Sequence, residues 1–78
     1  MSKSVEEMLR DQWLPAASMR RALRESGGLT LRQVADAVGV SSKMTISRWE
    51  RAIQEPRGEH RVRYSRLLRA LQGSMPHV

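Results

Sequence analysis

Glycine and proline interrupt this chain of 78 residues so often that only short regular segments fit between the breaks. The breaks lie at Pro15, Gly27-Gly28, Gly39 and Pro56. Proline cannot donate a helical backbone hydrogen bond, and glycine readily takes the left-handed conformation that ends a helix. Between the breaks, apolar residues recur every three or four positions, and no segment alternates apolar and polar residues as a half-buried strand would. The pattern therefore predicts an all-α fold.

Capping signals mark the starts of the predicted helices. Ser4 and Glu7 fit a capping box, and so do Thr30 and Gln33. Together with the apolar spacing, these signals predict helices over about residues 4–14, 15–25, 30–38, 41–53 and 59–71. The residues expected to be buried are Met19, Ala22, Leu23, Leu31, Val34, Ala35, Val38, Ile46, Trp49, Ile53, Tyr64, Leu67, Leu68 and Leu71.

The charge of the chain is strongly basic and unevenly distributed. Fourteen Lys and Arg residues stand against eight Asp and Glu residues, which gives a net charge of +6. Residues 1–17 hold two basic and three acidic residues, and residues 18–78 hold twelve and five, so the two parts carry −1 and +7. Such a domain favours a polyanionic partner, either a nucleic acid or, less often, an anionic membrane. The apolar stripe of the last predicted helix is better explained as core, so we expect no membrane partner.

Several classes of protein are not expected from this composition. The chain has no cysteine, no stretch of 18 apolar residues and no apolar leader after its first methionine, so we expect a cytoplasmic protein without disulfides. Neither a paired set of carboxylates nor a Gly-rich phosphate loop is present, and His60 and His77 are isolated. We therefore expect no enzyme, no metal site and no cofactor.

The middle of the chain carries the most specific pattern. A helix, a short turn at Gly39, a Ser-rich cap and a second helix form a helix-turn-helix layout. The segment LTLRQVADAVGVS at 29–41, followed by TISRWER at 45–51 and by Glu55-Pro56, resembles the Cro/C1-type (XRE) helix-turn-helix family, and RLLRAL at 66–71 is similar to that family's closing helix.

The resemblance implies a compact, five-helix, lambda-repressor-like domain over residues 18–73. Residues 1–17 would add an N-terminal helix, and residues 74–78 would form a flexible tail. The implied function is that of a transcriptional regulator, a repressor that binds double-stranded DNA in a sequence-specific way. Members of this family commonly bind pseudo-palindromic operators as homodimers. The implied source is bacterial or phage-encoded, with the protein associated with the nucleoid.

The sequence departs from the family pattern at three places. Leu31 stands where the family usually has a glutamine that binds a phosphate. One more residue than usual separates Gly39 from Glu50, so the positions of Lys43 and Met44 depend on where this extra residue lies. The segment between Pro56 and the end of the last helix is also longer than usual.

The helical wheel predicts which side chains of the second motif helix face DNA. With Ile46 inward, the outward face carries Met44, Ser47, Arg48 and Arg51. Arg48 could hydrogen-bond a guanine at two positions, and Met44 could pack on a thymine methyl group. The expected base-facing residues are Lys43, Met44, Ser47 and Arg48. The alternative for Arg48 is a phosphate contact or a solvated surface position.

Phosphate contacts are expected around this helix. Arg51 would clamp a phosphate, and the free backbone N–H groups at the start of the preceding helix also favour anions. The expected phosphate-binding residues are Thr30, Arg32, Gln33, Arg51 and Arg57. Thr30 has a structural alternative as the helix cap, and most arginines of the last helix are expected to be solvated. The family resemblance further implies an ion pair between Arg24 and Glu50.

The predicted N-terminal helix carries an apolar stripe of Val5, Met8, Leu9 and Trp13. This stripe either packs onto the domain's own core or forms a surface for a second copy or another protein. The rival interpretation of the whole chain is therefore an antitoxin-like interaction module that uses the helix-turn-helix fold to bind a protein partner.

Overall fold

The computed structural model of the chain describes residues 4–74, except for the side chains of residues 10–12. All regular structure in this part is helical, as predicted. The five helices are α1 (Val5–Gln12), α2 (Ala17–Ser26), α3 (Leu31–Val38), α4 (Lys43–Glu50) and α5 (Gly58–Gly73). None of the helices within residues 4–74 combines the length and the apolar character that crossing a membrane would require.

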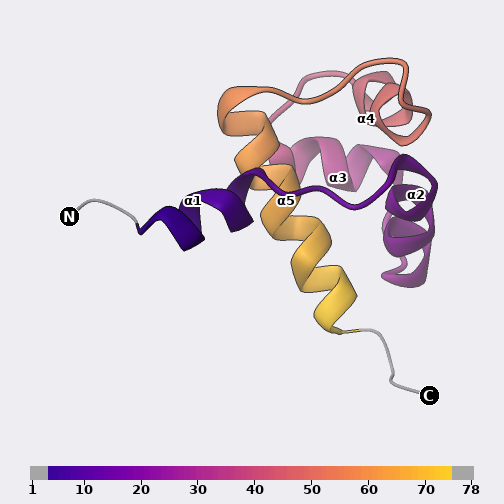
Figure 1. Cartoon of the computed structure of the whole chain (residues 1–78). Helices are drawn as coiled ribbons and strands as arrows, with labels where there is room; N and C mark the ends of the chain where they lie inside the picture. Colours follow the sequence, from indigo (N-terminus) through magenta and orange to yellow (C-terminus); the bar gives the residue numbers. More distant parts are fainter. Residues whose placement is uncertain (1–3, 75–78) are drawn as a thin grey trace.

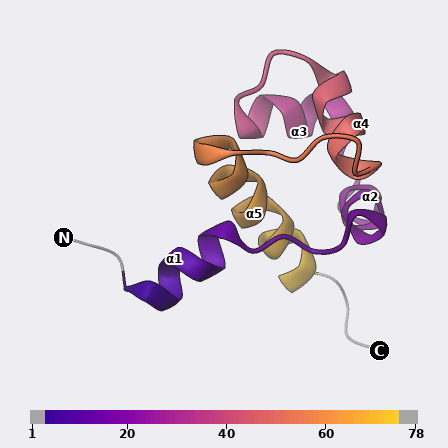
Figure 2. The same cartoon turned by 45° about the horizontal axis from the view of Figure 1, so that its top comes forward.

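Helices α2 and α3 pack against α5, the longest helix, and α4 reaches α5 through Trp49 (Figure 1). Helix α4 also packs on α2 and α3, so the three form one unit at one end of the molecule. Helix α1 lies beside α5 and projects from the other end, joined to α2 by an extended segment (Figure 2). Helices α1 and α4 therefore lie at opposite ends of a molecule that is 35 Å across.

The helix starts follow the capping residues read from the sequence. The Ser4 hydroxyl accepts a hydrogen bond from the Glu7 backbone at 3.2 Å. Thr30 and Gln33 form a reciprocal capping box, with bonds of 3.0 and 2.8 Å. The Ser42 hydroxyl accepts a bond from the Met44 backbone at 3.2 Å, which begins α4 at Lys43. Each of these bonds satisfies a backbone N–H group that the helix itself leaves unpaired.

The end of α4 differs from the prediction. The sequence pattern extends this helix to Ile53, but it ends at Glu50 and the Ile53 side chain is 65% exposed. The reason is Ala52, whose φ of 58° places it in the left-handed region. There the Ile53 backbone N–H donates to the Arg48 carbonyl at 3.0 Å, which closes the helix with a Schellman motif. A glycine normally occupies the left-handed position that ends a helix. The alanine at position 52 therefore did not indicate in the sequence that α4 ends here.

The core lies between α5 and the helix-turn-helix. Its buried apolar residues are Leu23, Val34, Ala35, Val38, Ile46, Trp49, Tyr64 and Leu68. The rings of Trp49 and Tyr64 lie with centroids 4.9 Å apart, which joins α4 to α5. The prediction that Met19 and Ala22 are buried is wrong, because the side of α2 that faces α4 is occupied by Arg20 instead.

Replacing Ala52 with glycine should stabilise the fold. A left-handed conformation costs an L-residue about 1–2 kcal/mol, whereas glycine adopts it freely at a somewhat higher entropic cost. We expect Ala52→Gly to raise the free energy of unfolding by about 0.5–1 kcal/mol in urea denaturation. The matched control is Ala37→Gly within α3, which should lower it by about 1 kcal/mol. Equal destabilisation by both changes would contradict the strain at Ala52.

Candidate nucleic-acid interface

Helix α4 divides into a buried face and an outward face. Ile46 and Trp49 are almost fully buried, whereas Lys43 and Arg48 are exposed and Met44 is 44% exposed. The side chains of Lys43 and Arg48 make no hydrogen bond and no ion pair within residues 4–74. Two cationic side chains and a methionine are therefore presented to solvent from one rigid helix.

Two other residues of the predicted outward face are placed differently. Ser47 is half-buried, because it lies at the edge of the buried face beside Ile46. Arg51 is exposed just after the last turn of α4, and its Nε donates to the Ser47 carbonyl at 3.4 Å. Fewer side chains of the outward face are therefore freely available to a ligand than the helical wheel predicted.

A hollow of about 390 Å³ lies where the starts of α3 and α4 meet. Thr30, Leu31 and Arg32 line it from α3, and Lys43 lines it from α4. The first turn of α3 carries no acidic residue, so its N-terminal dipole and the cations Arg32 and Lys43 favour an anion in this hollow. The structure thus brings together Thr30 and Arg32, which were predicted to bind phosphate, with Lys43, which was predicted to face bases.

The side chains around this hollow already have structural contacts. The Gln33 amide oxygen accepts the Thr30 backbone N–H, so this part of the side chain caps α3. Arg32 donates to the Ser41 carbonyl at 3.1 Å and lies 3.7 Å from the Asp36 carboxylate. Arg32 therefore fixes the turn that precedes α4 while about half of its side chain remains exposed. Leu31 packs partly buried against the core rather than facing outward.

The ion pair that the family resemblance implied between Arg24 and Glu50 is present. Arg24 Nε donates to Glu50 Oε2 at 2.6 Å, and Nη2 donates to Oε1 at 3.1 Å. The Glu50 side chain is only 6% exposed, and a third bond runs from Arg24 to the Leu29 carbonyl at 3.0 Å. This hydrogen bonding raises the pKa of the Arg24 guanidinium above its ordinary value. The two-pronged pair fixes the end of α4 against α2.

A second buried arginine, Arg20, was missed in the sequence. Its Nε donates to the Pro15 carbonyl at 2.9 Å, and its Nη1 donates to the Trp49 carbonyl at 2.9 Å and to Glu55 at 3.2 Å. These bonds hold the last turn of α4 and the loop after it. The available signal was spacing, because Arg20 lies four residues before Arg24 and therefore on the same face of α2.

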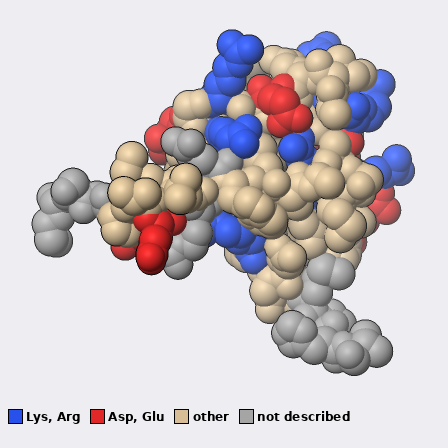
Figure 3. Space-filling view, viewed as in Figure 1, with Lys and Arg blue, Asp and Glu red and all other residues tan. Residues whose placement is uncertain are grey.

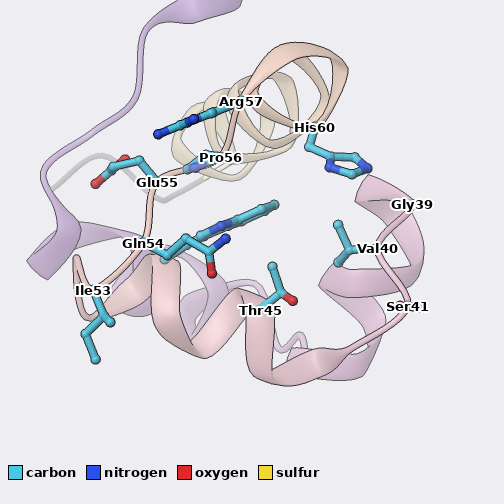
Figure 4. Close-up of a pocket in the computed structure, with 11 residues that line it drawn as sticks. Gly39, Val40, Ser41, Thr45, Ile53, Gln54, Glu55, Pro56, Arg57 and His60 are labelled. Atoms are coloured by element: carbon cyan, nitrogen blue, oxygen red, sulfur yellow. The ribbon is translucent and has the colours of Figure 1, made fainter.

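A larger hollow of about 840 Å³ lies between the helix-turn-helix turn and the loop that joins α4 to α5. Figure 4 shows Thr45 and Val40 on one side of it and Gln54, Pro56 and His60 on the other. Arg57 also lines it, immediately before α5, and no side chain caps the start of that helix. Arg57 places an exposed cation at this hollow, but Glu55 also lines it and Glu59 lies in the first turn of α5, so the charge here is mixed.

Most arginines of α5 were expected to be solvated, but Arg61, Arg63, Arg66 and Arg69 all have partners. Arg63 Nη1 donates to the Val38 carbonyl at 3.4 Å, so this residue caps the end of α3. Gly39 follows with a φ of 91°, and a Cβ atom there would lie 2.8 Å from the Arg63 guanidinium. The turn of the helix-turn-helix is thus closed by a glycine and by an arginine that lies against it.

Figure 3 shows Lys and Arg side chains spread over the upper and right parts of this face, with Asp and Glu side chains among them and further acidic side chains at α1. Among the residues that the structure describes, no group of His, Asp and Glu is arranged to hold a metal ion. Basic side chains therefore lie on the outward face of α4 and at both hollows, with Arg32 and Lys43 at the smaller one and Arg57 at the larger one.

A family model described as helix-turn-helix matches residues 21–74, more than two thirds of the chain. The chain belongs to the Cro/C1-type (XRE) helix-turn-helix family. No similarity to a curated protein or to a solved structure was found. The match begins within α2 and does not include α1.

Membership in this family indicates DNA binding, because helix-turn-helix domains of the XRE type are DNA-binding parts of transcription regulators. The family's partner is double-stranded DNA, and α4 is the second helix of the helix-turn-helix. The Arg24–Glu50 ion pair joins α2 to the end of α4 and so sets how α4 is held on the rest of the domain.

Breaking the Arg24–Glu50 pair should be costly. Replacing Arg24 with methionine leaves a buried carboxylate without its partner, and we expect a loss of roughly 3 kcal/mol in the free energy of unfolding. The matched control is Arg21→Met on the same helix, where the side chain is 71% exposed and pairs only with Glu25. That change should cost less than about 1 kcal/mol. Equal effects of the two substitutions in urea denaturation would show that the Arg24 pair does not hold the fold.

Proposed function

We propose that the chain is a sequence-specific repressor of transcription that reads a pseudo-palindromic operator through the major groove. The observation that carries this proposal is the outward face of α4, where Lys43, Met44 and Arg48 are exposed above a fully buried anchor. A DNA-reading helix needs this combination, because its outward side chains must be available while the helix itself stays fixed.

Arg48 is the main base-reading residue in this proposal. Its side chain is exposed, and within residues 4–74 it has no hydrogen bond or ion pair that binding would have to break. A guanidinium matches the two acceptors on the major-groove edge of guanine. Met44, one helical turn earlier, offers an apolar contact for a thymine methyl group, and Ser47 lies between them at the edge of the face.

Exposed cations on both sides of α4 would bind the DNA backbone. Thr30, Arg32 and Lys43 surround the smaller hollow, and Arg57 lies at the uncapped start of α5. Arg51, just beyond the last turn of α4, supplies a further cation, and Gln33 supports the first group through its cap of α3. Phosphate contacts on both sides of a recognition helix set its register in the groove without reading the sequence.

A homodimer completes the proposed regulator. Two copies related by a two-fold axis present two α4 helices to two half-sites, which accounts for a pseudo-palindromic operator. A dimer that occupies such a site represses by excluding other proteins from the same DNA. It acts where the DNA lies, in the cytoplasm of a bacterium or of a phage-infected cell.

Substitutions at Arg48 and Arg57 should have different effects on DNA binding. Arg48→Ala should remove about 1–3 kcal/mol of discrimination at one base pair, and so relax specificity there. Arg57→Ala should weaken binding to all sequences alike and lower the slope of log K against log salt by about 1. Fluorescence anisotropy on duplexes with single base-pair changes, over a range of salt concentrations, measures both effects.

The control is Arg21→Ala, which removes an exposed arginine from α2. This change should alter neither the base discrimination nor the salt dependence of DNA binding. If Arg48→Ala weakened binding uniformly and left every base preference intact, Arg48 would be a phosphate contact and the proposed base-reading role would be wrong. If neither variant changed DNA binding while a protein partner was still bound, the interaction-module interpretation would replace this one.

A further inference from the structure

Met44 is the one apolar side chain that α4 (Lys43–Glu50) turns outward. The other apolar residues of this helix, Ile46 and Trp49, are almost fully buried, whereas Met44 is 44% exposed and lies outside the core cluster. Only its backbone N–H contributes to the structure through a hydrogen bond, the one that it donates to the Ser42 cap. The proposed DNA-reading face therefore presents an apolar group beside the cationic Arg48, and the partner should offer an apolar group at the matching place.

The major groove of unmodified DNA offers one apolar group, the 5-methyl group of thymine. 5-Methylcytosine carries the same group at the same ring position. The two bases differ at position 4, where thymine has a carbonyl oxygen and 5-methylcytosine has an amino group. The thioether of Met44 donates no hydrogen bond and accepts only weakly, so its contact depends on the methyl group and not on this difference.

The exposed side chains of α4 hold no group that selects unmodified cytosine or adenine. Cytosine is read through its amino group by a carboxylate, and adenine is read by asparagine or glutamine. Helix α4 contains neither of these amides, and its one carboxylate, Glu50, is bound to Arg24. Lys43 lines the smaller hollow beside the start of α3. The remaining outward pair is therefore Arg48, which suits guanine, and Met44, which suits a methyl group.

The spacing of this pair indicates that the two bases are neighbours. Met44 and Arg48 lie four residues apart on α4, which places their Cβ atoms about 5–6 Å apart on one face. Successive nucleotides of one strand are about 3.4 Å apart along the DNA axis. The two side chains are therefore separated by less than two base steps, and both are long enough to reach adjacent bases.

We propose that α4 reads a 5-methylpyrimidine next to a guanine, so that methylation of a cytosine at this place strengthens DNA binding. This inference rests on the proposed function and adds the DNA modification to which the same site responds. Met44 packs on the 5-methyl group of thymine or of 5-methylcytosine, and Arg48 donates two hydrogen bonds to the guanine. An unmethylated cytosine keeps the guanine beside it but offers Met44 no methyl group.

The test starts from the inverted repeat that the protein enriches from a random pool of unmodified duplex DNA, in which we expect a thymine next to the guanine. Replacing this thymine with uracil in one half-site removes only the methyl group and should weaken binding about fourfold. Replacing the thymine–adenine pair with a cytosine–guanine pair should weaken binding at least as much. Methylation of that cytosine should then recover about fourfold, measured by fluorescence anisotropy.

Two variants assign the methyl effect to its side chain. Met44→Ala should bind the thymine and uracil duplexes equally, and likewise the cytosine and 5-methylcytosine duplexes. The matched control is Met19→Ala, which removes a similarly exposed methionine from α2, 47% against 44% exposed. This control should keep the fourfold dependence on the methyl group. Circular dichroism verifies that both variants remain folded.

Two outcomes would overturn this inference alone. A wild-type chain that binds the thymine and uracil duplexes equally does not read the methyl group. A Met44→Ala variant that keeps the dependence on the methyl group assigns the contact to another residue. In both cases, binding to the enriched repeat leaves the proposed function intact. A folded protein that enriches no sequence overturns the proposed function and this inference together.

Discussion

The position of α4 depends on two buried arginines of α2. Arg24 donates two hydrogen bonds to the Glu50 carboxylate. Arg20 donates to the Trp49 carbonyl and to Glu55 in the loop that follows α4. Charged groups are costly to bury, so each is compensated by bonds to the end of α4. The result is a direct, directional link between α2 and the helix that we propose reads DNA. Apolar packing of Ile46 and Trp49 alone would hold α4 in the core but would specify its orientation less precisely.

This link lets one short helix serve two purposes. Its inner side chains and its last turn are held by the core and by α2, while its outer side chains keep their full hydrogen-bonding capacity. An eight-residue helix would be marginal by itself. Three features therefore keep this short helix ordered: the cap at Ser42, the left-handed residue Ala52 and the bonds from α2. The proposed reading of base edges requires an ordered helix.

The sequence predicted those features that depend on local chemistry. The capping box of Thr30 and Gln33 follows from residue type and spacing, and the glycine turn at Gly39 follows from backbone freedom. The Arg24–Glu50 pair came from the family resemblance rather than from spacing, because the two residues meet only in the folded chain.

Features that depend on long-range contacts or on unusual backbone were not predicted. Arg20 was not expected in the core, since a buried arginine is recognisable only from the carbonyls that receive its bonds. The end of α4 was misplaced because alanine takes a glycine-like conformation at position 52. The exposure of Val5, Met8 and Leu9 on α1 could not be predicted from their spacing, because a helix that packs on the core shows the same spacing.

The most direct test of the account is selection from a random pool of double-stranded DNA by the purified protein, at about 150 mM salt so that non-specific phosphate binding is suppressed. We expect enrichment of one inverted repeat whose half-sites contain a guanine that Arg48 reads. A folded protein that enriches no sequence would contradict the claim that α4 is a DNA-reading helix.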